Sequence, residues 1–371
     1  MSTVKANNYQ DASGGSNAQL FGVASPPNSM GFRNRIINGA MVIDQRNAGA
    51  SVTQGTSISY VTDRFGVVGS AASKFTAQQS STAPTGFINS LLCTSSSAYA
   101  VGSSEDFTVR HVIEGLNCAD FAWGSANAAT VTLSFWVRSS LTGTFGGSVS
   151  NSAQDRFYVF SYTINAANTW EQKTITITGD TSGTWLTTNG IGIRLFWSLG
   201  AGATVSGTAG SWGTTFYRSA TGAVSVVGTN GATFYITGVQ LEAGTVASPF
   251  ERRPYGTELA LCQRYFEKSY DESTTPGTST DTGALLGISP GNTNRVFASI
   301  QLRVTKRGAP TYTIYSTTGA SGNIRDVTAG ADKAVSLATT AGQNGVGLIC
   351  TAGITAVTNT LAFQYTASSE L

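Results

Sequence analysis

Apolar and polar residues alternate in short stretches along most of this chain, and turn-forming residues separate these stretches. The clearest is VTLSFWVRS at 131–139, whose odd-numbered residues from Val131 to Val137 share one face of a strand. Comparable patterns are RFYVFSYTI (156–164), KTITIT (173–178), GIRLFWSL (192–199) and ATFYITGVQLE (232–242). The turn signals NAAN, TGDTSG, GAGAT and GTNG lie between them. This spacing predicts an all-β protein built on a jelly-roll-like antiparallel sandwich.

The composition supports an all-β chain with more than one domain. Its 371 residues exceed the roughly 100–200 residues of a typical domain, so two domains are expected. Charged residues make up 11%, well below the roughly 25% of average proteins, while 43 glycines favour many turns. Aromatic residues at 10% are sufficient to build a core. The net charge of +2 gives no basic footprint for nucleic acid or an anionic membrane.

These patterns divide the chain into four parts. Residues 1–32 are polar, contain Pro26-Pro27 and lack the apolar core of a signal peptide, so we expect an arm that attaches to a partner. The other parts are a jelly-roll-like sandwich (33–250), an elbow with a short helix (251–274) and a smaller C-terminal β domain (275–371). Strand patterns in the last part are RVFASIQLRVT (295–305), TYTIYS (311–316) and TLAFQYTAS (360–368).

The elbow holds a dense group of charges and two prolines in ASPFERRPYGTELALCQRYFEKS (247–269). Pro249 and Pro254 restrict its backbone, and Thr257 is expected to cap a helix. We interpret the segment as a structural joint between two β domains, seated through the apolar face of the helix. Its charges are expected to pair between chains of an oligomer. The joint residues are Glu251, Arg252, Arg253, Leu259, Cys262 and Phe266.

No constellation for catalysis stands out in the sequence. His111 is the only histidine, and neither GxSxG nor HExxH is present, so no enzyme is expected. A glycosidase needs two converging carboxylates, and the available acidic residues show no such spacing. These residues include Glu105, Asp106, Glu114, Asp120, Asp155 and Asp180.

The cysteines and the apolar runs also give no functional signal. No CxxC pair is present, so we expect buried free thiols, no metal and no cofactor. No apolar run reaches the roughly 18 residues of a membrane span. The four cysteines are Cys93, Cys118, Cys262 and Cys350.

Aromatic residues with glycine neighbours are candidates for sugar binding. Aromatic rings stack on the apolar faces of pyranoses, while amides and carboxylates bind the hydroxyl groups. Trp136 and Trp197 lie within strand patterns and are expected in the core. The candidates for an exposed glycan platform are Trp123, Trp185, Trp212 and Tyr217. The alternative is that these residues pack at a sheet edge or at a subunit contact.

Several stretches, taken in order, resemble bacteriophage tail-fibre and minor tail proteins. They are RNRIINGAMVIDQRNAG, YVTDRFGV, VIEGLNCADFAWGSANAATVTLSFWVRSSLTGTF, TWEQKTITITGDTSGTW, ITGVQLEAGTVASPFERRPYGTELALCQRYFEKS and the terminal FQYTASSEL. The resemblance covers residues 33–270 and, less specifically, the C-terminal block. It implies a virion structural protein, usually trimeric, with a sandwich similar to carbohydrate-binding modules. It provides no residue-level binding site.

Together these observations predict a homotrimeric tail fibre that is assembled in the bacterial cytoplasm and attaches a phage to host surface glycans. The arm is expected to bind other virion proteins. VFSYTI and GIRLFWSL hold more apolar residues than one core needs, and the surplus is expected to meet a symmetric partner. The alternatives are a head fibre or capsid decoration, a connector without a ligand, and a tailspike that cleaves polysaccharide.

Overall fold

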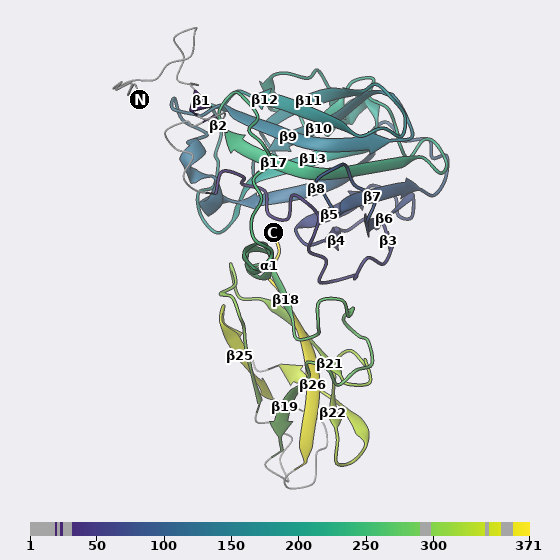
Figure 1. Ribbon diagram of the computed structural model, residues 1–371, viewed down its shortest axis with the longest axis vertical. Coiled ribbons are helices and arrows are strands. Elements are labelled where there is room, and N and C mark those ends of the chain that lie inside the picture. The colour runs from purple at the N-terminus through teal and green to yellow at the C-terminus, as the bar shows by residue number, and fades with distance from the viewer. Residues whose placement is uncertain (1–18, 21–22, 25–31, 290–297, 338–340, 350–358) are drawn as a thin grey trace, which may run out of the picture.

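The computed structural model describes residues 19–20, 23–24, 32–289, 298–337, 341–349 and 359–371. They form a larger lobe, which holds the elements from β3 to β17, and a smaller elongated lobe, with one helix between the two (Figure 1). Most of the expected N-terminal arm lies outside the described residues. Its described elements are β1 (Gln19–Leu20) and β2 (Val23–Ala24), which pair with each other.

The larger lobe is a sandwich of two antiparallel sheets. One has the strand order β15-β11-β10-β13-β8-β5-β4, and the other has the order β12-β9-β17-β7-β6-β3. The strands of the seven-stranded sheet are β4 (Ser59–Thr62), β5 (Phe65–Gly69), β8 (Asp106–Glu114), β10 (Gly143–Ser150), β11 (Phe157–Ile164), β13 (Ile191–Ala201) and β15 (Trp212–Gly213). Those of the six-stranded sheet are β3 (Val52–Thr53), β6 (Phe75–Ser80), β7 (Ser90–Ser95), β9 (Val131–Ser139), β12 (Glu171–Ile177) and β17 (Thr233–Ala243). Neighbours far apart in sequence, such as β8 and β13, are typical of jelly-roll-like sandwiches.

Side chains that recur with a period of two fill the space between the sheets. Val131, Leu133 and Phe135 of β9 are fully buried, as their alternation predicts. Leu195 and Trp197 of β13 face them from the other sheet, and the Trp197 ring centroid lies 5.9 Å from that of Phe135. The all-β fold class with an antiparallel sandwich is therefore confirmed.

Several strands of the sandwich were not predicted, because glycine, serine and threonine interrupt their alternation of apolar and polar residues. β3 to β7 and β10 belong to this group. In β10, a Cβ on Gly147 would lie 2.2 Å from the carbonyl oxygen of Phe196, so only glycine fits there. The short connecting elements are η1 (Gly115–Asn117), η2 (Ala119–Phe121), η3 (Ala203–Val205), β14 (Ser206–Gly207) and β16 (Ser219–Ala220).

The helix α1 (Tyr255–Gln263) lies between the lobes (Figure 1). Its N-cap is Pro254, whose carbonyl oxygen accepts hydrogen bonds from the backbone N–H groups of Thr257 and Glu258. The prediction that Thr257 caps the helix is wrong, because Thr257 already lies in the first turn. No side chain caps this helix, and Pro254 starts it instead by fixing the entering backbone.

The smaller lobe is built around β26, which pairs with β18, β19, β21 and β22. Its strands are β18 (Phe266–Lys268), β19 (Leu285–Ile288), β20 (Ala298–Gln301), β21 (Thr311–Ser316), β22 (Asn323–Asp326), β23 (Ala331–Ala334), β24 (Ser336–Leu337), β25 (Gly345–Ile349) and β26 (Thr360–Ser368). Two expectations need correction. β18 was expected in the elbow but belongs to this sheet, and the described part of the 295–305 pattern forms a strand only over β20.

The described cysteines match the expectation of buried free thiols. Cys93, Cys118 and Cys262 are all buried and unpaired, while Cys350 lies outside the described residues. Burial raises the pKa of the Cys118 thiol to about 12, so it is protonated and unreactive at neutral pH.

Candidate functional site

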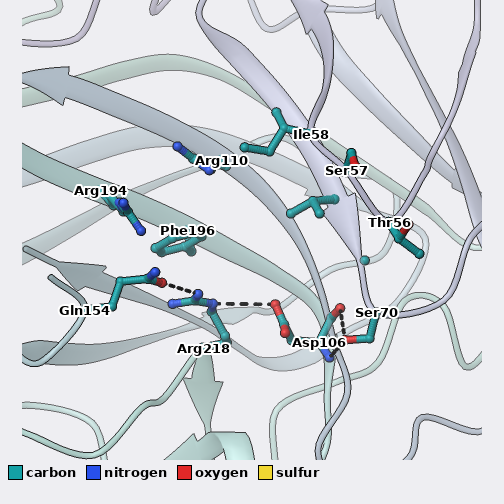
Figure 2. A pocket seen from close by; sticks show the side chains of 12 residues that line it. Thr56, Ser57, Ile58, Ser70, Asp106, Arg110, Gln154, Arg194, Phe196 and Arg218 are labelled. Atoms are coloured by element: carbon teal, nitrogen blue, oxygen red, sulfur yellow. Dashed lines mark hydrogen bonds and ion pairs between the residues drawn. The ribbon is translucent and has the colours of Figure 1, made fainter. Parts of the chain in front are cut away.

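An open groove of about 520 Å³ lies on the outer face of the seven-stranded sheet. Figure 2 shows Arg110, Arg194 and Arg218 around Phe196, with Asp106 and Gln154 on either side of the Arg218 guanidinium. The groove is lined by Thr56, Ser57, Ile58, Val68, Gly69, Ser70, Asp106, Arg110, Gln154, Arg194, Phe196 and Arg218.

The strand register explains why these side chains meet. In β13 the residues that point into the core alternate with Arg194 and Phe196, which face outward. Phe196 lies between Ser148 of β10 and Arg110 of β8, and Arg194 lies opposite Ser150 of β10. Directly opposite residues of antiparallel strands share a face. These five side chains therefore belong to one polar and aromatic surface.

The segment that contains β14 and β16 folds back over part of this face. A Cβ on Gly146 of β10 would lie 2.5 Å from the backbone nitrogen of Ala220 of β16, so glycine permits the close approach. Arg218 precedes β16, and the centre of its guanidinium lies 4.1 Å from the ring centroids of both Phe196 and Phe216. The cation stacks between two aromatic rings.

This stacking corrects one expectation about the apolar residues of β11 and β13. The surplus apolar residues of VFSYTI and GIRLFWSL were expected to meet a symmetric partner, but Val159 and Phe196 are covered by the chain itself and are only 2% and 3% exposed. The Phe216 ring lies 5.4 Å from that of Phe157, and the Arg218 guanidinium covers Phe196. The surplus apolar area is thus buried within one subunit.

The three arginines of the groove differ in their partners. Arg218 donates from Nη2 to Oε1 of Gln154 at 2.6 Å, and its Nε lies 3.5 Å from Oδ2 of Asp106. Arg110 donates from Nη2 to the backbone oxygen of Leu371 at 3.0 Å. Within the described chain, the guanidinium of Arg194 forms no ion pair, and its buried Nε has no hydrogen-bond partner. The charged groups that line the groove are these three guanidinium groups and the carboxylate of Asp106.

Other buried polar atoms on this face are also without a hydrogen-bond partner in the described part of the chain. Leaving such a group unpaired costs about 1–3 kcal/mol, so native structures contain few of them. Their concentration here has no structural role that the described contacts explain. The atoms are Oγ1 of Thr108, Nη1 of Arg218 and the Oγ atoms of Ser148, Ser150 and Ser219.

The protein surrounds these positive charges with few stabilising groups. Burial, with a smaller effect of the nearby Arg110 charge, lowers the pKa of Arg194 to about 10. Burial also lowers the pKa of Arg218 to about 10, although the Asp106 carboxylate opposes this shift. Both arginines remain protonated at neutral pH, so the groove is positively charged.

The structure brings three of the four predicted platform residues together, but as a packed cluster. The ring centroids of Trp123, Trp185 and Trp212 lie 4.7, 5.3 and 5.4 Å apart in edge-to-face contacts. Each indole N–H donates to a backbone carbonyl oxygen, at 2.8, 3.2 and 2.7 Å respectively. Tyr217 lies apart from them, with its ring over Gly207.

An exposed platform is therefore the wrong prediction for Trp123, which is only 8% exposed. Trp185 and Trp212 are partly buried and pack against the main core. The glycine-flanked loops carry these rings onto the sandwich because each ring buries a large apolar area there. The cluster has the packing role that the sequence left open as the alternative.

The predicted joint residues lie where the lobes meet, and the described partners of their charges are in the same chain. The Glu251 carboxylate accepts hydrogen bonds from the backbone N–H groups of Arg33 and Asn34 at 2.9 and 3.0 Å. Arg253 donates to the backbone oxygen of Ile36 at 3.1 Å. The guanidinium of Arg252 lies 4.7 Å from the Phe87 ring centroid. Glu251 and Arg253 thus find partners in the segment of their own chain that begins at Phe32, and pairing of these charges between chains stays a prediction.

The apolar joint residues seat the helix on the larger lobe. Cys262 packs in a small cluster with Ile37, Ile43 and Tyr265, and Leu259 packs against it. Phe266 follows the helix, and the centre of the Arg46 guanidinium lies 3.8 Å from the centroid of its ring.

Buried ion pairs tie the two lobes together at the same place. The Glu114 carboxylate of β8 accepts hydrogen bonds from Arg264 at 2.6 and 2.9 Å and from the Tyr265 hydroxyl at 2.6 Å. Arg64, which is 1% exposed, pairs with Glu370. At the joint, charged side chains of one lobe thus pair with charged side chains of the other.

Comparison with known proteins gives a distant structural likeness and no sequence match. No protein-family model matches the sequence, and no curated protein matches it. The enzymatically active domain of bacteriophage CBA120 tailspike protein 4 is similar with a TM-score of 0.32 and 11% identity. That likeness covers 57% of this chain, which spans only 21% of the tailspike chain.

Carbohydrate-binding modules show a similar distant likeness. TmCBM61, solved in complex with β-1,4-galactotriose, has a TM-score of 0.28 and 12% identity over 57% of this chain and 99% of that one. The family 11 module from Clostridium thermocellum, in complex with a mixed-linked tetrasaccharide, has a TM-score of 0.27 and 10% identity over 53% and 98%. These scores place no ligand on this chain.

Sequence reasoning missed the arginines of the groove and found only Asp106, as one of many carboxylates. A signal was present in GIRLFWSL, where Arg194 and Phe196 alternate with residues of the core. Among the described residues, no three His, Cys, Asp or Glu side chains gather into a metal-binding group. The described helices include none with the length and apolar character of a membrane span.

Proposed function

We propose that this chain binds carbohydrate through the groove on its seven-stranded sheet, as part of a bacteriophage particle that attaches to its host. The observation that carries the proposal is an open groove lined by polar side chains, in which the guanidinium of Arg194 has no partner among the described residues. Saccharides present many hydroxyl groups that guanidinium, amide and hydroxyl side chains bind by hydrogen bonds.

The dimensions and the lining of the groove support a saccharide ligand. Its volume of about 520 Å³ falls within the roughly 300–1,000 Å³ of ligand sites. Gln154, Ser57 and Ser70 add polar side chains, while Ile58 and Val68 contribute apolar surface. A sugar ring has both polar edges and apolar faces, so this mixture suits it.

We propose binding without cleavage. Asp106 is the sole carboxylate among the lining residues, and it is paired with Arg218. Hydrolysis by two carboxylates needs a second one roughly 5–10 Å away. Incubating a bound polysaccharide with the protein should therefore release no new reducing ends. Sustained release would favour the alternative of a depolymerising tailspike.

The virion assignment rests on the resemblance of residues 33–270 to tail-fibre and minor tail proteins. On this proposal the chain is a homotrimer, and weak sugar contacts at several sites act together to raise avidity by around 10²–10⁴-fold. Sedimentation of a monomer at micromolar concentration would contradict the trimer. Immunogold labelling of intact particles separates a tail location from a head location.

The groove is tested by blocking it from its rim. Ser57 is exposed and lines the groove, so Ser57→Trp places a bulky ring at its mouth. Thr174→Trp is the matched control, because Thr174 is an exposed residue of β12 on the other sheet. Both variants and the parent are assayed against a panel of purified bacterial polysaccharides by biolayer interferometry.

We expect the parent and Thr174→Trp to bind the same polysaccharides and Ser57→Trp to lose at least tenfold in affinity. Equal binding by all three proteins would overturn the assignment of the site to this groove. Binding by none of them to any polysaccharide would count against a carbohydrate function and favour a connector without a ligand. Circular dichroism checks that both variants are folded.

A further inference from the structure

We infer that the groove selects an anionic saccharide and that Arg194 pairs with its carboxylate or phosphate group. The inference rests on the proposed function, because it names the class of ligand for the same groove. It is carried by the difference between Arg194 and the other cations of the site.

Arg194 is the groove arginine to which the described protein provides neither an ion pair nor a hydrogen-bond acceptor. Arg218 is held by Asp106 and Gln154, and Arg110 is held by Leu371. For Arg194 no such contact exists among the described residues, and its Nε is buried without a hydrogen-bond partner. Burying part of a guanidinium without a partner is costly, so a purely structural role leaves this arrangement unexplained.

The local charge balance points to an anion. The groove has an excess of two positive charges, because Asp106 faces three arginines. The Arg110 charge and partial burial both disfavour the protonated state of Arg194. An anion bound beside Arg194 would offset both effects, whereas a neutral sugar would offset neither.

The geometry of the side chain fits an oxyanion. A guanidinium presents paired N–H donors in a planar fork, which matches the two oxygens of a carboxylate or of a phosphate. Phe196 lies two residues from Arg194 on the same strand face, and the Arg218 guanidinium covers its ring. Arg194 is thus set on a rigid central strand of the sheet rather than on a flexible loop.

The test removes the charge from the polysaccharide and, separately, from the protein at position 194. The acidic polysaccharides that bind the full chain are each converted to a neutral form, by carboxyl reduction of uronic acids or by removal of phosphate groups. Affinities for native and neutral forms are measured with the parent, Arg194→Gln, Arg194→Lys and Arg138→Gln. Arg138 is the control because it is a partly exposed arginine of β9 that donates to the backbone oxygen of Asn168.

We expect neutralising the polysaccharide to weaken binding to the parent by about 10- to 100-fold, as for a charge-assisted hydrogen bond. Arg194→Gln should lose the same factor with the native polymer and be insensitive to neutralisation. Arg194→Lys should retain part of the preference, and Arg138→Gln should behave like the parent. If carboxyl reduction weakens binding, the group that Arg194 binds is a carboxylate. If dephosphorylation weakens binding, it is a phosphate.

Three results would overturn the inference, and they differ in what they mean for the proposed function. If neutral polysaccharides bind as well as acidic ones and Ser57→Trp still blocks them, carbohydrate binding stands and the anion preference falls. If no polysaccharide binds the groove, both fall. A preference for acidic polymers that Arg194→Gln leaves intact would also overturn the assignment to Arg194.

Discussion

The groove and the joint are both rich in arginine, but they differ in whether the guanidinium groups have partners within the chain. At the joint, Arg64 is fully buried, pairs with Glu370, donates to the backbone oxygen of Val112 and lies 3.5 Å from the Tyr265 ring centroid. In the groove, Arg194 is partly exposed and has no such set of contacts within the described chain.

This difference separates charges that hold the fold from charges that are available to a ligand. A buried charge whose partners all lie in the same chain stabilises one arrangement, and removing one partner leaves the other uncompensated. A charge without internal partners contributes little to stability, yet it can contribute much to binding. The same substitution in the two regions should therefore give different results.

The largest effect is expected at the joint. Arg64→Gln should lower the free energy of unfolding by about 3–5 kcal/mol, because it removes a buried ion pair and a stacked guanidinium. Urea denaturation followed by tryptophan fluorescence measures the change. A loss of less than about 1 kcal/mol would show that the contacts between the lobes do not depend on this pair.

An intermediate effect is expected from pH at Asp63, which pairs with Arg46 at 3.2 Å beside Phe266 of the joint. Burial raises the pKa of Asp63 from 3.8 to about 6, against the opposing charge of Arg46. Between these values the folded state binds more protons than the unfolded state, so the free energy of unfolding falls as pH rises from about 4 to about 6. The contribution of this group is about 2 kcal/mol, and it is constant above that window.

Asp63→Asn should remove this part of the pH dependence, measured as urea midpoints at pH 4, 5, 6 and 7. The control is Asp281→Asn, since Asp281 is exposed in the smaller lobe. An unchanged slope in Asp63→Asn would mean that other carboxylates of the joint govern the titration.

The smallest effect on stability is expected in the groove. Arg194→Gln should lower the free energy of unfolding by no more than about 0.5 kcal/mol, because no described ion pair is lost. The measurement is the same urea titration used for Arg64→Gln. A destabilisation above about 2 kcal/mol would place Arg194 with the structural arginines and erase the contrast between the two regions.

Much of the fold could be predicted because strand alternation is a local property. The pattern of VTLSFWVRS placed the core residues of β9 correctly, and the presence of a helix after Pro254 also followed from local signals. The glycine- and serine-rich strand β10 could not be recognised, because its residues are chosen for close contacts with other strands such as that of Gly147 with Phe196.

The candidate site could be predicted only in part, for a related reason. Exposure of an aromatic residue depends on what folds over it, and the sequence does not show that Trp123, Trp185 and Trp212 converge from three separate segments. The alternation in β13 does show that Arg194 faces away from the core. It does not show which charges Arg194 meets there.

The sequence by itself determined the all-β sandwich, the buried thiols and the outward direction of Arg194, since each follows from residue type and strand period. The tertiary structure decided which charges are paired. Arg64 finds Glu370 across 306 positions of the chain, and Arg194 finds no partner among the described residues. Strand register and the packing of the lobes set such long-range neighbours, and neither is contained in any local stretch of the sequence.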